Sequence, residues 1–186
     1  MRSARSTPEV NYMNLQRTLL AGIAIGALSV GTAMAQSNAN RLRRSDTEFM
    51  TKAAEGGMAE VEMGRIAEQH AANQKVKDFG QRMVKDHTKI NDELKQVASQ
   101  KSVTLPTTVD AKQKSTLDKL SQLNGAAFDR DYMEDMVKDH EEDVSEFQRE
   151  ADSGNDPAVK AFAAKTLPTL REHLKLAEDI RPQVTK

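Results

Sequence analysis

The sequence predicts an all-α fold, an up-down four-helix bundle, and three observations lead to this prediction. Four long segments carry apolar residues at steps of three and four, which is the spacing of one helix face. No stretch alternates β-branched and polar residues with the period of two that marks a strand. Charged residues make up 30% of the chain and aromatic residues only 4%, a balance typical of a solvated helical protein rather than a β-sandwich.

The four long helices are expected at residues 46–71, 74–100, 126–152 and 157–181. Ser45 and Glu48 predict a capping box at the start of the first helix. Asp156 and Pro157 predict the start of the fourth, because proline fits the first helical position, and Pro182 predicts its end. The short connections inside each pair predict two antiparallel hairpins.

A connection of about 25 residues joins the two hairpins. It contains a short expected helix at about 109–123, where Leu117, Leu120 and Leu123 recur at a spacing of three. A connection of this length can run along the bundle, so it permits the crossover topology of ferritin-like bundles.

Two internal sequence repeats, called echoes below, imply two different alignments of the helices. The pentapeptide that ends at His87 recurs exactly in the one that ends at His140. More loosely, Val76-Lys77-x-Phe79 recurs as Val159-Lys160-x-Phe162. These echoes could reflect an ancient duplication of a helical hairpin, but the sequence does not choose between the two alignments.

Residues 1–35 have the pattern of a secretory signal peptide. Leu19 to Gly31 is an uncharged run of 13 residues that follows Arg17, and Ala33-Met34-Ala35 is an A-x-A cleavage signal before Gln36. A bilayer needs about 20 apolar residues. Cleavage near Ala35-Gln36 is therefore favoured over an uncleaved membrane anchor, with Met1 or Met13 as the start.

After cleavage, residues 36–45 are expected to form a flexible lead-in, 46–181 the bundle and 182–186 a tail. No second long apolar run follows, so we expect no stable membrane insertion and a periplasmic location. With 27 Lys+Arg against 28 Asp+Glu, nucleic acid is not expected as a partner. The lack of cysteine excludes disulfides, thiolate metal sites and thiol nucleophiles. A protein partner is not indicated.

Each long helix carries one ionisable residue within a mostly apolar column: Glu60, His87, His140 and His173. The first three lie within about two residues of their helix centres, which is a common level to within about 3 Å, whereas His173 is about 6 Å off level. Because an unpaired buried carboxylate is very costly, Glu60 needs imidazole or metal partners. Three imidazoles and a carboxylate suit one divalent transition metal such as Zn, Fe, Mn or Cu.

The simpler alternative is a structural or protein-interaction bundle without metal, whose histidines are hydrogen-bonded core groups. Asp86 and Asp139 point about 100° away from the neighbouring histidines, so they are candidates for outer partners or surface residues. Asp143 could orient His140 or join it. No nucleophile–base motif supports a hydrolase or an oxidase.

The glycine pair Gly56-Gly57 in the middle of the first helix has two interpretations. Glycine lowers helix propensity, so its presence indicates either a close approach between helices or a local opening for a ligand.

Several of these positions together resemble the exported bacterial family called domain of unknown function 4142. The similarity covers about residues 46–181 and rests on five motifs: Gly56-Gly57-Met58-Ala59-Glu60-Val61-Glu62, Met83-x-x-Asp86-His87, Phe128-Asp129-x-x-Tyr132, Met136-x-x-Asp139-His140 and Leu167-Pro168-x-Leu170-x-x-His173-Leu174. The resemblance implies a ferritin-like crossover bundle and implies no activity.

The sequence departs from the di-iron pattern of ferritin-like proteins, which needs Glu-x-x-His on two helices. Val84, Val137 and Leu170 stand three residues before the histidines. A carboxylate-bridged di-iron centre is therefore not expected, and a mononuclear site or none fits better. The function that we expect is an exported bundle in envelope metal handling or stress tolerance.

Overall fold

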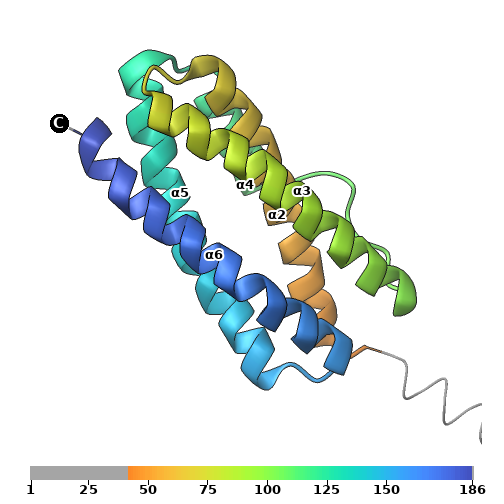
Figure 1. Ribbon diagram of the computed structural model, residues 1–186. Coiled ribbons are helices and arrows are strands. Elements are labelled where there is room, and N and C mark those ends of the chain that lie inside the picture. Colours follow the sequence, from red (N-terminus) through yellow and green to blue (C-terminus); the bar gives the residue numbers. More distant parts are fainter. Residues whose placement is uncertain (1–41, 186) are drawn as a thin grey trace, which may run out of the picture. The chain divides into compact units, whose positions relative to one another are not determined.

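The computed structural model describes residues 42–185, and its regular structure in this range is entirely helical. The helices are α2 (Arg44–His70), α3 (Gln74–Gln100), α4 (Ala111–Leu120), α5 (Gly125–Ser153) and α6 (Pro157–Val184) (Figure 1). The predicted signal peptide, its cleavage site and residues 36–41 of the expected lead-in lie outside the described residues.

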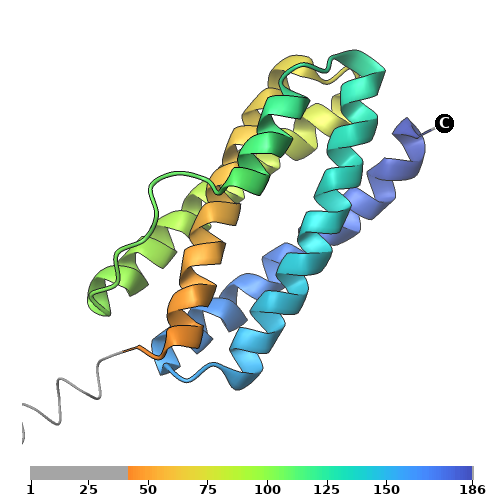
Figure 2. The same cartoon turned by 180° about the vertical axis from the view of Figure 1, so that it is seen from behind.

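The topology is the expected ferritin-like crossover. Helix α2 packs against α3 and α5, and α6 packs against the same two helices. Residues 101–124, including α4, return along the bundle, so that α3 and α5 run in the same direction on opposite sides of its axis (Figures 1 and 2). Every pair of adjacent long helices is therefore antiparallel, which confirms the predicted fold class.

Two predicted helix ends are wrong. Helix α2 begins at Arg44, two residues early, and the hydroxyl of Ser45 donates to Asp46 (3.1 Å) instead of capping the helix. Helix α6 continues through Pro182 to Val184. Proline removes one backbone donor, but at this exposed helix end water can bind the freed carbonyl.

Two buried aspartates tie each hairpin to the loop of the other. Asp46 at the start of α2 accepts hydrogen bonds from two backbone N–H groups of the α5–α6 loop, at 2.7 and 3.2 Å. Asp129 at the start of α5 accepts from two backbone N–H groups of the α2–α3 loop, at 2.8 and 3.0 Å. Each carboxylate satisfies loop donors that no helix can satisfy.

This reciprocity decides between the two echoes in the sequence. Asp46 and Asp129 are 83 residues apart, and so are Val76 and Val159. A shift of 83 residues also brings α2 onto α5 and α3 onto α6 almost end to end. The described part of the chain is therefore a repeated helical hairpin, whose copies are related by the looser of the two echoes.

The core consists of two apolar clusters on either side of a polar layer. One cluster, which includes Met63, Met83 and Met136, lies toward the α2–α3 loop. The other, which includes Phe49 and Phe147 with ring centroids 4.9 Å apart, lies toward the α5–α6 loop. The polar layer between them contains the four ionisable residues that the sequence singles out.

The loop contacts of Asp46 predict how acid destabilises the fold. Burial raises the pKa of Asp46, but hydrogen bonds from Asn155, Asp156 and Ser45 outweigh it and lower the pKa below its ordinary value. Asp46 therefore stabilises the fold fully above that ordinary value and loses this contribution as the pH falls through the folded pKa. Asp46→Asn should cost about 1–3 kcal/mol of unfolding free energy at pH 7.

Urea denaturation of both proteins at pH 7 and pH 3 tests this. The difference between wild type and Asp46→Asn should shrink at pH 3, and a constant difference would contradict the argument. Asp92→Asn is the matched control, because Asp92 is exposed and forms a surface ion pair with Lys95 (3.1 Å); it should change stability by less than about 0.5 kcal/mol.

Candidate metal centre

The structure brings Glu60, His87, His140 and His173 together in the polar layer, each from a different long helix. All four side chains are at most 2% exposed. His173 joins the other three although the sequence placed it off level. Because α6 extends to Val184, His173 lies less than one turn from the middle of its helix.

Each of the three imidazoles has one ring nitrogen next to an acceptor. Nδ1 of His140 donates to the carbonyl of Met136 (2.9 Å), one turn earlier in α5. Nε2 of His173 lies 2.9 Å from the carboxylate of Asp86 in α3. Nδ1 of His87 lies 2.7 Å from Oε2 of Glu60. For His140 and His173 the hydrogen-bonded neighbour favours a proton on that nitrogen of the neutral ring.

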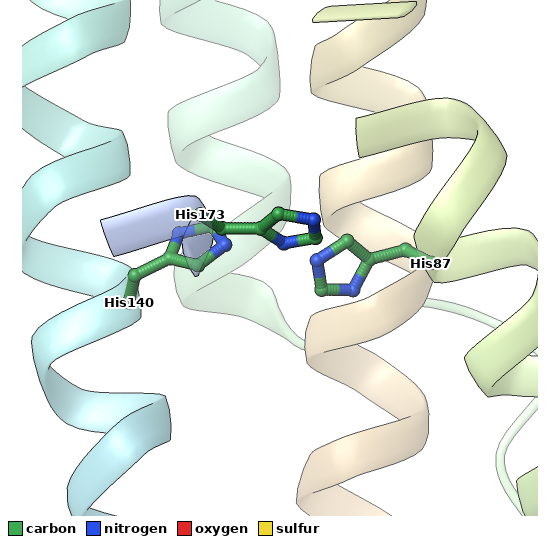
Figure 3. A group of neighbouring side chains, drawn as sticks. All are labelled: His87, His140 and His173. Atoms are coloured by element: carbon green, nitrogen blue, oxygen red, sulfur yellow. The ribbon is translucent and has the colours of Figure 1, made fainter. Parts of the chain in front are cut away.

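The other ring nitrogen of each imidazole is buried and has no hydrogen-bond partner: Nε2 of His87, Nε2 of His140 and Nδ1 of His173. The rings from α3, α5 and α6 turn toward one another (Figure 3), with centroids 5.3–5.7 Å apart. One ring nitrogen of each lies within 4.8 Å of the other two. Three electron-pair donors thus converge on one buried point.

Glu60 lies against this point. Its Oε1 is 3.3 Å from Nε2 of His140, while its Oε2 faces His87. Both oxygens are within ion-pair distance of an imidazole, yet neither makes a hydrogen bond with acceptable angles. Because buried polar atoms normally have partners, the carboxylate is a fourth donor available to a ligand at the centre.

The burial of the centre favours neutral groups. Burial lowers the pKa of His87 and that of His173 to about 4. Burial, and after it the two neighbouring imidazoles, also lower the pKa of His140. Burial and the charge of Asp139 raise the pKa of Glu60 well above its ordinary value. The imidazoles therefore stay unprotonated at neutral pH, which is the state that binds metal.

Two further polar residues, Asp86 and Tyr132, lie near the centre and were not among the expected ligands. Asp86 contacts His173 across the α3–α6 interface. The sequence had left Asp86 as either an outer partner of a histidine or a surface residue. Tyr132 is fully buried, and its hydroxyl has no hydrogen-bond partner. In the sequence, Tyr132 is part of one of the family motifs and lies eight residues, about two helical turns, before His140. His70, the remaining histidine, lies apart at the end of α2 and contacts the carbonyl of Leu123.

The donor set has the chemistry of a nitrogen-rich metal site. Metal–imidazole bonds are about 2.0–2.1 Å long. An ion at the centre of three nitrogens at most 4.8 Å apart would lie at most about 2.8 Å from each, so each nitrogen must move inward by at most about 0.7 Å. Side-chain adjustment can supply such a movement.

No helix in residues 42–185 combines the length and the apolar character needed to cross a bilayer. The family model described as Domain of unknown function (DUF4142) matches residues 31–180. The chain therefore belongs to this family. Among curated proteins, none matches the sequence.

Two solved structures share the fold. A DUF305 fragment from Deinococcus radiodurans has a TM-score of 0.68 at 10% identity, over 77% of this chain and 99% of the other. A DUF305 protein from Streptomyces coelicolor, named as a presumed secreted protein, has a TM-score of 0.65 at 13% identity, over 75% and 92% of the two chains. At these identities the likeness concerns the fold alone.

Proposed function

We propose that this member of the DUF4142 family binds one divalent transition metal ion in the middle of its bundle. The ligands are Nε2 of His87, Nε2 of His140, Nδ1 of His173 and Oε1 of Glu60. Imidazole and carboxylate donors suit Zn, Fe, Mn and Cu. The absence of Glu-x-x-His pairs argues for one ion rather than a carboxylate-bridged pair.

The observation that carries the proposal is that the two nitrogens of each imidazole ring have different surroundings. Histidines that bind metals use one nitrogen for the ion and donate the other N–H to a carboxylate or a backbone carbonyl. Here the outer nitrogens face Glu60, the Met136 carbonyl and Asp86, and the inner nitrogens are the unpartnered ones.

The alternative, a bundle whose histidines are ordinary core groups, accounts for only half of this pattern. A satisfied core histidine has partners at both nitrogens or exposes one to water. Three buried nitrogens without partners, together with Oε1 of Glu60, which also has none, favour the metal-binding function.

We place this function in the cell envelope, in metal handling or stress tolerance. The support is the signal-peptide pattern of residues 1–35 and the structural likeness to a protein named as a presumed secreted one.

Addition of Co²⁺ to metal-free, untagged protein tests the site directly. One equivalent should bind and give the intense visible d–d bands of a low-symmetry, nitrogen-rich Co²⁺ site. Free metal at 100 times its dissociation constant should stabilise the fold by about 2.7 kcal/mol, a rise in melting temperature of roughly 5–10 °C. Equilibrium dialysis with elemental analysis gives the stoichiometry.

His140→Gln should abolish the bands and the thermal shift. His70→Gln is the matched control, because His70 lies outside the centre, and it should leave both unchanged. A wild-type protein that shows neither bands nor a thermal shift with Co²⁺, Zn²⁺, Cu²⁺, Mn²⁺ or Fe²⁺ would refute the proposed function.

Asp86 should act by positioning His173. Asp86→Asn weakens the acceptor that holds Nε2 of this ring, so we expect a 10–100-fold loss of metal affinity without loss of the metal-free fold. Competition titration against a chelator measures the affinity, and far-UV circular dichroism checks the fold. Asp78→Asn, on the surface of the same helix, should retain wild-type affinity; equal losses in the two variants would contradict a positioning role.

A further inference from the structure

The metal centre is closed to solvent, so an ion needs a way in. Two cavities approach the polar layer from different sides. One, of about 220 Å³, lies between α2, α4 and α5 and contains Asp139 and Asp143. The other, of about 270 Å³, lies between α3 and α6 and contains Asp86, which holds His173.

The lining of the α2–α4–α5 cavity includes residues about one turn before and after two of the proposed ligands. On α2 it is lined by Gly56 and Met63, which are four residues before and three residues after Glu60. On α5 it is lined by Met136 and Asp143, which flank His140 at the same spacing. Residues at these spacings share one helix face, so Glu60, whose carboxylate has no hydrogen-bond partner, lies on the face of α2 that borders this cavity.

The two neighbouring glycines of α2 differ in what surrounds them. Gly56 lines the cavity, and a β-carbon added there would lie 3.6 Å from the side chain of Gln113 in α4. Gly57 has one of the two roles that the sequence allowed, because a β-carbon there would collide with Asn91 of α3. Gly57 thus serves a close helix contact, whereas Gly56 borders the cavity and a β-carbon there would make an ordinary contact.

Seven acidic and three basic side chains line the cavity. At its rim, Lys52 pairs with Glu146 (2.8 Å) and Lys112 with Glu142 (3.5 Å). Within the described part of the chain, no basic side chain lies within ion-pair distance of Asp139 or Asp143. Unpaired acidic groups in a concave, low-dielectric wall concentrate counter-ions and speed their capture.

The hairpin repeat identifies Asp143 as the counterpart of Glu60. The two residues are 83 positions apart, the same shift that relates Asp46 to Asp129. In α5 Asp143 therefore occupies the place that Glu60 has in α2, on the face that turns toward the bundle axis.

The α3–α6 cavity is less suited to a cation. Its lining includes Arg82, Lys89 and Lys165. Arg82 lies 3.2 Å from Asp86 and 2.8 Å from Glu172, so the carboxylate nearest to the centre on this side is already paired.

We propose that Asp139 and Asp143 form an outer, all-oxygen site for a hydrated divalent cation, through which the ion reaches the buried centre. This inference rests on the proposed function for its second half, the delivery of the ion. Carboxylates and water are the ligands that partly hydrated ions keep, and Glu60 is the next donor along the path. Exchange of the remaining waters for imidazoles then completes the transfer.

Stopped-flow mixing with Co²⁺ tests the route, with the d–d bands of the buried centre as the signal. The double variant Asp139→Asn/Asp143→Asn should reach the wild-type final spectrum at least 10-fold more slowly, and the wild-type rate should fall with added salt. The matched control is Glu134→Gln/Glu141→Gln, which removes two exposed charges from the same helix; it should keep the wild-type rate. Thermal melting of the metal-free variants checks their folding.

Each other outcome is informative. An unchanged uptake rate in Asp139→Asn/Asp143→Asn overturns the outer site and leaves the proposed function intact. Loss of the final spectrum in a folded double variant makes Asp139 or Asp143 part of the inner ligand set, which also overturns the outer site.

If wild-type protein shows no Co²⁺ bands at all, the proposed function fails, and the outer site is tested alone with Mn²⁺. Loss of the electron paramagnetic resonance signal of free Mn²⁺ in wild type but not in the double variant supports the outer site. An unchanged signal in both overturns it.

Discussion

The cost of removing ionisable groups from water governs the middle of this bundle. Four such side chains occupy a layer where an ordinary bundle would place leucine or methionine, and burial opposes the charge of each one. The structure meets this cost by keeping the imidazoles neutral and by placing an acceptor beside one nitrogen of each ring. The inner ring nitrogens have no hydrogen-bond partners. These are the atoms that a metal ion would use.

The apolar clusters on both sides of this layer make the arrangement rigid. Met63, Met83 and Met136 pack on one side, and Phe49 and Phe147 on the other. Each imidazole is therefore confined between close-packed surfaces, which limits the number of rotamers open to it. Rings held in this way lose little further freedom when they bind an ion, and this favours tight binding.

Spacings of three and four within single helices were enough to predict the four helices and the four ionisable residues of the polar layer, although His173 was expected off level. The crossover was expected from the length of the connection between the hairpins and from the family resemblance. Contacts between helices were not predictable in this way. Asp46 satisfies donors in a loop more than 100 residues away, so the local sequence suggested a capping box at Ser45 instead. The link between Asp86 and His173 and the cavity beneath α4 likewise depend on how helices pack, which a single sequence does not encode in any local pattern.

The reciprocal loop contacts of Asp46 and Asp129 also bear on assembly. Each hairpin supplies half of the centre, Glu60 and His87 from the first and His140 and His173 from the second. Each hairpin also holds the loop of the other. Residues 101–124 connect the two hairpins, and their length lets the hairpins of one chain pack against each other. If this segment were too short to return along the bundle, the same contacts would be satisfied by exchange of hairpins between two molecules. The product would be a domain-swapped dimer with two complete centres, each built from both chains.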